Sequence, residues 1–365
     1  MKYSAIAAVV LGAGLLLWLL FWPAPIDAVA WQPPDPPAMA GDYAPNSLLQ
    51  KATLLAQGKI YGPEDIAVDD DGILYGGTQD GKIVRVHTDG RVEDWVNTGG
   101  RPLGLQFDAS GNLIVCDAYK GLLSVDRSGK VSVLATEAGG VPFGFTNDLD
   151  IASDGRIYFT DASSQWNQSA YMLDLMEGRP WGRFLVFDPA TGNTRVLVDD
   201  IHFANGVALS ADQDFVLINE TWRYRILRYW LKGERQGTRD VFIDNLPGFP
   251  DGISGNRDGT FWVALPTPRN PTVDRLYPHP WLREILVKLP ESLQPEPVAY
   301  GFVLGLSEEG RVIANLQDPA GTHLQEITSV EEHNGYLYFG SLHNRRIGRL
   351  ALCPPGAEQG NCLAE

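Results

Sequence analysis

The sequence predicts an all-β fold, a six-bladed β-propeller preceded by an N-terminal transmembrane helix. Three observations lead to this prediction. The 365 residues include 39 glycines and 25 prolines, which favour frequent turns over long helices. A unit of a turn, an alternating strand, a short link and a further strand recurs along the chain. An uncharged apolar segment of helical length stands near the start of the chain.

The apolar segment, residues 5–22, has 18 consecutive uncharged residues and follows Lys2. At about 1.5 Å per residue, a helix of this length spans about 27 Å, which nearly crosses the hydrocarbon core of a bilayer. Trp18 and Trp22 suit the membrane interface, and the proline after them ends the helix. We expect residues 1–22 to be a signal anchor that leaves the rest of the chain on the non-cytoplasmic side, periplasmic in a bacterium.

A cleaved signal peptide is the alternative for this region. Ala28–Ala30 supply small residues for a cleavage site, although the apolar segment exceeds the usual length of a signal-peptide core. Residues 23–45 are rich in proline and lack periodicity, and they predict a stiff stalk. The propeller is expected at 46–352, with a C-terminal tail at 353–365.

Six turns mark the repeat, at intervals of roughly 40 to 75 residues that fit four-stranded blades with insertions. An apolar strand follows each turn, and a pair of sandwich domains is the structural alternative. Residues 52–56 are expected to close the ring by pairing with residues 346–350. The turns are Asp71-Gly72, Ser110-Gly111, Asp154-Gly155, Asp212-Gln213, Asp258-Gly259 and Asn334-Gly335.

Two insertions, residues 163–183 and 266–282, interrupt the repeat and carry many aromatic side chains. Long loops in a compact domain are usually functional or mobile. These two are expected to line a substrate entrance, to touch the membrane surface, or to pack against the propeller rim.

Charge and motifs exclude several classes of function. The 45 acidic and 29 basic residues give a formal net charge of -16, which disfavours binding to nucleic acid and to anionic lipid headgroups. The sequence has no nucleophile elbow, P-loop or dinucleotide fingerprint, and its cysteines lack zinc-site spacing. Cys353 and Cys362 are expected either to form a disulfide or to remain two surface thiols, and Cys116 reads as a core residue.

Four repeats carry an oxygen-bearing side chain just before an apolar run, at equivalent positions, so that circular symmetry converges them near the propeller axis. Two carboxylates and two amides suit Ca²⁺, with Mg²⁺ or Mn²⁺ as alternatives, whereas zinc prefers histidine or cysteine. Each residue alone also fits a turn-initiating role. The four predicted metal ligands are Glu64, Asn147, Asn205 and Asp251.

A metal held with an open position can polarise an ester or lactone carbonyl and stabilise the oxyanion formed when water attacks. Asp251 is expected to act as both ligand and general base. His202 is a candidate proton shuttle, and His323 and His343 are further candidates, because histidine titrates near neutrality. A structural role is the alternative for each of the three histidines.

Several strings of this sequence resemble the strictosidine synthase-like branch of the gluconolactonase and paraoxonase propeller superfamily. The resemblance is strongest to the adipocyte plasma membrane-associated protein group, and it covers about residues 62–350. The strings are Asp117–Leu122, Asn147–Asp150, His202–Val207, Glu220–Tyr224, Asn245–Asp251 and Glu332–Gly335.

The resemblance implies a six-bladed propeller, an N-terminal membrane anchor and calcium-dependent arylesterase or lactonase activity. It places the four predicted ligands where the hydrolase members hold their metal. The family commonly has asparagine after the last aspartate, whereas Gly252 follows it here, which implies one polar contact fewer. Strictosidine synthases themselves use a late glutamate, and Glu326 lies in a comparable region.

Together these observations predict a calcium-dependent hydrolase of small-molecule esters or lactones, with the metal at the mouth of the propeller channel. Two alternatives stay open. One is a non-catalytic, membrane-anchored binding propeller whose metal only rigidifies the channel. The other is a strictosidine synthase-like condensation of an amine with an aldehyde.

Overall fold

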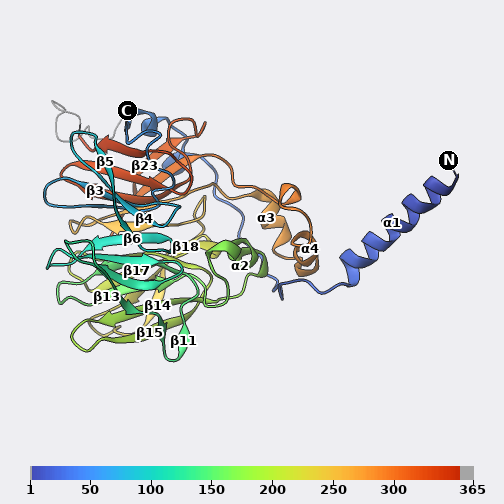
Figure 1. Cartoon of the computed structure of the whole chain (residues 1–365), viewed down its shortest axis with the longest axis horizontal. Helices are drawn as coiled ribbons and strands as arrows, with labels where there is room; N and C mark the ends of the chain where they lie inside the picture. The colour runs from blue at the N-terminus through green and yellow to red at the C-terminus, as the bar shows by residue number, and fades with distance from the viewer. Residues whose placement is uncertain (1, 354–365) are drawn as a thin grey trace.

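The computed structural model describes residues 2–353. Six four-stranded antiparallel sheets are packed around a central axis, which confirms the six-bladed propeller (Figure 1). The blades are β2–β5 (Ile66–Val68, Leu74–Gly77, Lys82–Val86 and Val92–Asn97), β6–β9 (Pro102–Phe107, Leu113–Asp117, Gly121–Val125 and Val131–Ala135), β12–β15 (Thr146–Ile151, Ile157–Asp161, Gly182–Asp188 and Asn193–Ile201), β16–β19 (Ala204–Leu209, Phe215–Glu220, Arg225–Trp230 and Arg239–Ile243), β20–β23 (Ile253–Gly255, Thr260–Ala264, Gly301–Ser307 and Val312–Asp318) and β24–β26 with β1 (Ile327–His333, Tyr336–Ser341, Ile347–Ala351 and Thr53–Leu55).

The turns between the first two strands of the blades follow the sequence pattern closely. In the first blade, Asp69 Oδ1 accepts hydrogen bonds from the backbone of Asp71 at 3.1 Å and of Ile73 at 2.8 Å. Gly72 takes a φ of +76°, a conformation that favours glycine. The side chain of Asp108 makes the same two bonds in the second blade. The predicted turns therefore do separate paired strands.

The innermost strand of each blade contacts the innermost strands of the two neighbouring blades, so that β2, β6, β12, β16, β20 and β24 form a closed ring around the axis. Closure comes from β1, which pairs antiparallel with β26 and places Leu54 opposite Gly348. The predicted pairing of the two ends of the propeller is confirmed. β1 is the outermost strand of the last blade, so the N-terminal end of the propeller completes the blade that the C-terminal end begins.

The two insertions fold into short helices that cover one end of the propeller (Figure 1). The first contains α2 (Tyr171–Glu177), and the second contains α3 (Pro271–Leu276) and α4 (Pro280–Leu286). Asn270 caps α3 by accepting a hydrogen bond from Thr272 N at 2.9 Å. Helices of six or seven residues are too short for helical periodicity to be visible in a sequence. We call α2, α3 and α4 the cap.

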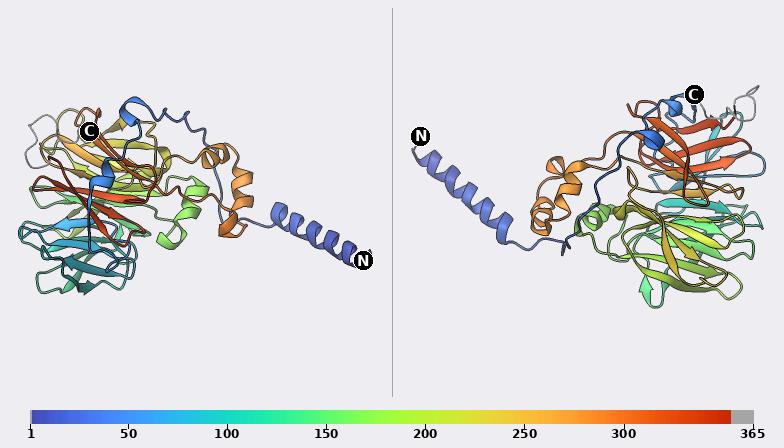
Figure 2. Two further views of the ribbon diagram at one scale, coloured as in Figure 1. Left: turned by 90° about the horizontal axis from the view of Figure 1, so that it is seen from above. Right: turned by 180° about the vertical axis from the view of Figure 1, so that it is seen from behind.

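Residues 23–45 differ from the predicted stalk, because part of this segment lies against the cap (Figure 2). Val29 N donates to Glu177 O at 3.0 Å, and Trp31 N donates to Tyr277 O at 3.2 Å. Ile26 is only 7% exposed. Apolar side chains spaced along this proline-rich segment find partners on the cap, and they bind it to the propeller. We call residues 26–35 the strap.

The helix α1 (Lys2–Phe21) precedes the strap and projects away from the propeller (Figure 2). Lys288, just beyond α4, donates from Nζ to Leu19 O at 2.9 Å, near the end of α1. Within residues 2–353, no helix is both long and apolar enough to cross a membrane. The predicted transmembrane anchor therefore stays a prediction.

The cysteines agree with their predicted roles where they are described. Cys116 is a buried free thiol on β7. Cys353 is disulfide-bonded, and the predicted partner Cys362 lies outside the described residues. A disulfide at Cys353 is therefore part of the structure, and the alternative of a free thiol there is wrong.

Candidate functional site

The four predicted metal ligands meet at one end of the central channel. Asn147 lies on β12 and Asn205 on β16, while Glu64 and Asp251 lie two residues before β2 and β20. All four line one cavity of about 170 Å³ beneath the cap. We call these four residues the tetrad. The structure thus brings together residues that are far apart in sequence, from Glu64 to Asp251.

The side chains of the tetrad are nearly buried and poor in protein partners. Asn205 Nδ2 donates a hydrogen bond to Asp251 Oδ1. Glu64 is 8% exposed and Asn147 is 4% exposed, yet neither side chain hydrogen-bonds to another residue in the described part of the chain. Buried polar groups normally find partners. These side chains are therefore available to a ligand in the cavity.

The electrostatics of the tetrad favour a cation. Burial raises the pKa of Glu64 well above its usual range, and the charges of Asp251 and Asp65 raise it further, whereas Arg101 lowers it. Burial also raises the pKa of Asp251 to about 7, against the hydrogen bond from Asn205, which lowers it. Both carboxyl groups are thus costly to ionise in the protein alone, and a bound cation would remove that cost.

The donor set fits a hard divalent cation, because two carboxylates and two amide groups provide oxygen ligands that suit calcium. Among residues 2–353, no group of three or more histidine, cysteine, aspartate or glutamate side chains is arranged to hold a metal. The tetrad contains only two residues of those types, since the other two are asparagines. A site for zinc or another soft metal is therefore not favoured here.

Neighbouring blades hold the backbone of the tetrad in place. Thr328 Oγ1 donates to Glu64 O at 2.6 Å, and Thr160 Oγ1 donates to Asn205 O at 2.7 Å. Asp251 O accepts from the side-chain amide of Asn219 at 2.5 Å. The donors come from β24, β13 and β17. Such contacts fix the side chains in the geometry that a binding site requires.

The structure explains why position 252 is a glycine, which the sequence alone did not reveal. A Cβ atom at this position would lie 2.4 Å from Thr328 O, and Gly252 N donates to the same oxygen at 2.8 Å. The backbones approach too closely for any side chain at this position. The glycine is therefore required by the close packing of β24 beside Asp251, and an asparagine would not fit without movement of the backbone.

The wall of the cavity opposite the tetrad is apolar. Phe145, Phe203 and Phe249 come from the propeller, and Met172 and Leu175 come from α2 of the cap. The insertion at 163–183 thus forms part of the cavity wall, a position that agrees with its predicted place at a substrate entrance. A larger cavity of about 340 Å³ occupies the channel on the other side of the tetrad. Glu64, Asn147 and Asn205 line both cavities.

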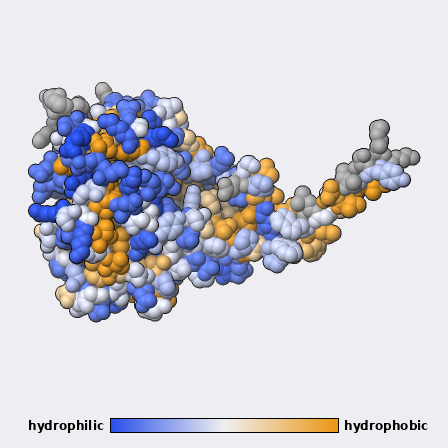
Figure 3. All heavy atoms as spheres, in the orientation of Figure 1, coloured by the Kyte–Doolittle hydropathy of each residue, from blue (hydrophilic) through white to orange (hydrophobic). Residues whose placement is uncertain are grey.

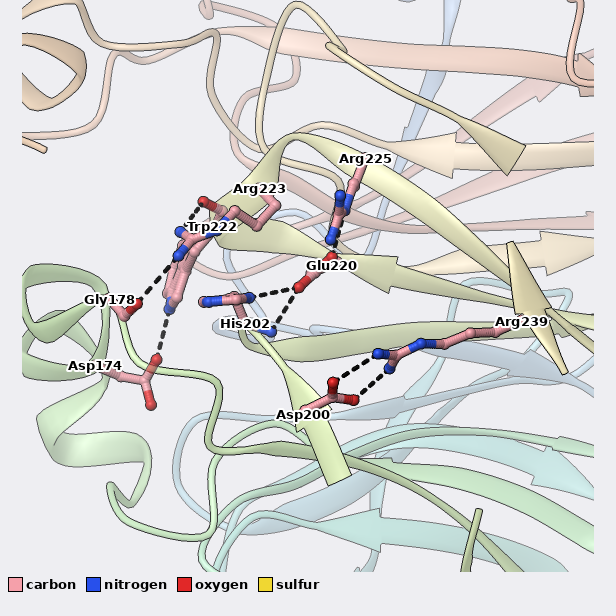
Figure 4. A network of polar contacts seen from close by, with 9 residues as sticks. All are labelled: Asp174, Gly178, Asp200, His202, Glu220, Trp222, Arg223, Arg225 and Arg239. Atoms are coloured by element: carbon pink, nitrogen blue, oxygen red, sulfur yellow. Dashed lines mark hydrogen bonds and ion pairs between the residues drawn. The ribbon is translucent and has the colours of Figure 1, made fainter. Parts of the chain in front are cut away.

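His202 does not line this cavity, although the sequence made it a candidate proton shuttle. Its Nδ1 lies 2.7 Å from Glu220 Oε1, and its backbone N donates to the same oxygen at 2.9 Å (Figure 4). Burial lowers the pKa of His202, although the hydrogen bond to Glu220 raises it. Burial also raises the pKa of Glu220, yet His202 and Arg225 together lower it to about 2. This arrangement agrees with the structural alternative for His202.

The other two candidate histidines differ in position. His323 Nε2 lies 2.7 Å from Ala52 O and is not among the residues that line the cavity. His343 does line the cavity, and its Nδ1 is hydrogen-bonded to Glu326 Oε2. Glu326 lines the cavity as well. The sequence had singled out His343 and Glu326 separately, but it did not predict their pairing, because the two residues lie on separate loops with β24 and β25 between them.

Comparisons with known proteins agree with this architecture. A family model described as strictosidine synthase matches residues 147–234, and one for the N-terminal part of strictosidine synthase-like proteins matches residues 41–86. The rat (Rattus norvegicus) adipocyte plasma membrane-associated protein is 38% identical over 94% of this chain and 98% of its own length. Strictosidine synthase-like protein 6 of Arabidopsis thaliana is 40% identical over 83% of this chain and 82% of its own length.

Solved structures agree on the fold. A gluconolactonase from Xanthomonas campestris superposes with a TM-score of 0.61 at 18% identity, over 91% of this chain and 99% of that one. A luciferin-regenerating enzyme superposes with a TM-score of 0.59 at 14% identity, over 84% and 96% of the two chains. Given its long alignments to these relatives, the chain belongs to the strictosidine synthase-like family, alongside the adipocyte plasma membrane-associated proteins.

Proposed function

We propose that this protein is a calcium-dependent hydrolase of carboxylic esters or lactones that carry an apolar acyl or aryl group. The observation that carries the proposal is the position of the tetrad, whose two carboxyl groups of raised pKa face an apolar cavity. Among proteins of similar fold, one is named a gluconolactonase. That name is consistent with hydrolysis of a cyclic ester, but the apolar wall favours a less polar substrate than a sugar lactone.

Glu64, Asn147, Asn205 and Asp251 would hold the cation, with Mg²⁺ or Mn²⁺ as alternatives to Ca²⁺. A divalent cation supplies a positive charge that polarises a carbonyl oxygen and stabilises negative charge on it. Asp251 was expected to serve as general base too. A carboxylate that binds a cation is a weaker base. We therefore assign Asp251 to holding the metal, and another residue must accept the proton.

The apolar wall has two tasks in this proposal. Phe145, Phe249 and Leu175 bind the acyl or aryl group by burial of apolar surface. They also limit the water around the reacting carbonyl, which strengthens the electrostatic effect of the tetrad. A cavity of about 170 Å³ suits a small ester or lactone rather than a polymer.

We also propose that the N-terminal segment attaches the propeller to a membrane on its non-cytoplasmic side. The 18 uncharged residues that follow the single early lysine support this location. Hydrophobic side chains are exposed along α1 (Figure 3), among them Leu11 at 74% and Phe21 at 77%. The relatives are named as plasma membrane-associated.

The test is hydrolysis of phenyl acetate and a panel of small lactones by the full chain in detergent, first with calcium and then with excess chelator. We expect turnover with calcium, loss of turnover with chelator, and loss in Asp251→Ala. Asp71→Asn, an exposed carboxylate on a turn, serves as the matched control and should keep full activity. Turnover that survives chelation contradicts the proposal. Calcium binding without any turnover would favour the non-catalytic binding propeller instead.

A further inference from the structure

The cavity contains a second polar centre that faces the tetrad from another part of the ring. Glu326 immediately precedes β24, and His343 follows β25 of the same blade. His343 Nδ1 is hydrogen-bonded to Glu326 Oε2. Both side chains line the same cavity as the tetrad. The side chain of His343 is 48% exposed and that of Glu326 is 17% exposed, so small molecules from solvent can reach the histidine.

The backbone holds Glu326 in an unfavourable conformation. Its φ of +47° lies in the left-handed region, which a residue with a long side chain rarely adopts. Two backbone hydrogen bonds keep it there, from Glu326 N to Tyr300 O at 2.9 Å and from Leu342 N to Glu326 O at 3.3 Å. Residues held in this way cluster at functional sites. The second bond also ties Glu326 to the residue next to His343.

Tyr171 of the cap shows that the two polar centres face a shared space. Tyr171 lines the cavity. Burial raises the pKa of Tyr171, and the charges of Glu326 and Asp251 raise it further. Tyr171, Glu326 and the tetrad all line one cavity of about 170 Å³, so Glu326 and the tetrad border the same small volume. A substrate carbonyl bound at the tetrad would therefore lie in the cavity that His343 also borders.

We propose that His343 is the general base of the hydrolytic reaction and that Glu326 is its positioning residue. The inference rests on the proposed function. With Nδ1 bonded to the Glu326 carboxylate, the neutral ring carries its proton on Nδ1 and leaves Nε2 free to accept a proton. His343 is better placed for this task than His202, which lies outside the cavity lining and is held by Glu220.

The reaction balances with water as the only co-reactant. His343 Nε2 takes a proton from water as the water oxygen forms a bond to the acyl carbon. The bond between the acyl carbon and the alkoxy or phenoxy oxygen then breaks. The proton on His343 passes to that leaving oxygen, which yields a carboxylic acid and an alcohol, or a hydroxy acid from a lactone, and returns His343 to its neutral form.

The test uses the full chain in detergent with calcium and phenyl acetate. His343→Ala should lower kcat/KM by about 100-fold or more, the usual contribution of general acid-base catalysis. Added imidazole should restore turnover in a concentration-dependent manner, because the exposed position leaves room for it. Glu326→Gln should lower kcat by about 10- to 100-fold through misplacement of the ring. A histidine with only a structural role would show no rescue by imidazole.

His333→Ala is the matched control, since His333 bonds to Asn334 on a blade turn away from the cavity, and it should neither lose activity nor respond to imidazole. If circular dichroism shows that His343→Ala is not folded, the loss of kcat/KM is measured on His343→Gln instead. A His343 variant that turns over substrate as fast as the wild type overturns this inference alone. Absence of turnover in the wild type overturns the proposed function and this inference with it.

Discussion

The side-chain amide of Asn205 donates a hydrogen bond to Asp251 Oδ1 across the boundary between two blades. Asn205 lies on β16, and Asp251 lies two residues before β20 of the next blade. The amide nitrogen is used by this bond, so the Oδ1 atom of Asn205 is left as a ligand for a cation. The same bond fixes the carboxylate of Asp251. Two of the four tetrad residues therefore depend on one another for their orientation.

Asn205→Ala is expected to abolish the response of the protein to calcium. In the wild type, calcium at about 100 times its Kd should raise the free energy of unfolding by about 2.7 kcal/mol, and chelator should reverse the effect. Without Asn205, one oxygen ligand is lost and Asp251 is no longer held. Thermal unfolding with calcium and with chelator measures the difference. Asn193→Ala, at an exposed position on β15, is the control, and an unchanged calcium response in Asn205→Ala would contradict the proposed ligand set.

Asp174 in α2 is expected to make stability fall as pH rises from about 4 to about 7. Burial raises its pKa to about 7, against hydrogen bonds from Ser163 and Trp222 that lower it. Between the unfolded and folded pKa values, the folded protein keeps a proton that the unfolded chain has lost, so the free energy of unfolding decreases with pH in that window and is lowest above it.

Asp174→Asn should remove the contribution of Asp174 to this dependence, because the amide cannot ionise but can still accept the 2.8 Å hydrogen bond from Trp222 Nε1. We expect the variant to gain on the order of 1 to 3 kcal/mol over the wild type at pH 8 and little at pH 4. Chemical unfolding at the two pH values measures this. Asp71→Asn should leave the profile unchanged. A variant whose stability ran parallel to the wild type at every pH would show that Asp174 is not the titrating group.

Gly252→Ala is expected to destabilise the propeller and to weaken calcium binding together. The added Cβ would lie 2.4 Å from Thr328 O and 3.2 Å from Ser329 Cα, so β20 and β24 must separate. Overpacking of this kind costs about 1 to 3 kcal/mol. Gly14→Ala is the control, because nothing lies within 4 Å of a Cβ there. Unfolding curves and calcium titrations measure both effects, and a Gly252→Ala variant as stable as the wild type would contradict the close approach.

The sequence was sufficient for the fold and the tetrad because both are periodic. The turn aspartates repeat once per blade, and Glu64, Asn147, Asn205 and Asp251 recur at one position of that repeat. Circular symmetry then places them together without any knowledge of packing. The pairing of β1 with β26 follows from the same logic, since an open ring would expose a strand edge.

What the sequence did not predict depends on contacts that carry no period. The pairing of His343 with Glu326 joins two loops. Its geometry depends on a strained φ at Glu326, which the residue pattern does not predict. The need for Gly252 comes from a strand of another blade. The strap was predicted to be a stalk because Ile26 and Trp31 lie in a short proline-rich segment that shows no apolar period, and only the folded cap reveals what they pack against.

The strap gives the last prediction, which concerns the cap. Trp31 packs edge-on against Tyr277 with ring centroids 5.0 Å apart, and Arg223 stacks on Trp31 at 4.2 Å. Arg283, 1% exposed, donates from the cap to Met176 O at 2.6 Å and also to Val29 O of the strap. The strap thus joins α2 to α4, and α2 forms part of the cavity wall.

A chain that begins at residue 46 should therefore be less stable than one that begins at residue 23, and its cap should loosen around the cavity. Trp31→Ala should reproduce most of the loss, on the order of 1 to 3 kcal/mol for a partly buried tryptophan. It should also raise KM more than it lowers kcat, because the apolar wall is disturbed and the tetrad is not. Trp281→Ala, 58% exposed on α4, is the matched control. Equal stability of the two truncated chains would show that the strap contacts contribute nothing, and the cap would then have to be held by the propeller alone.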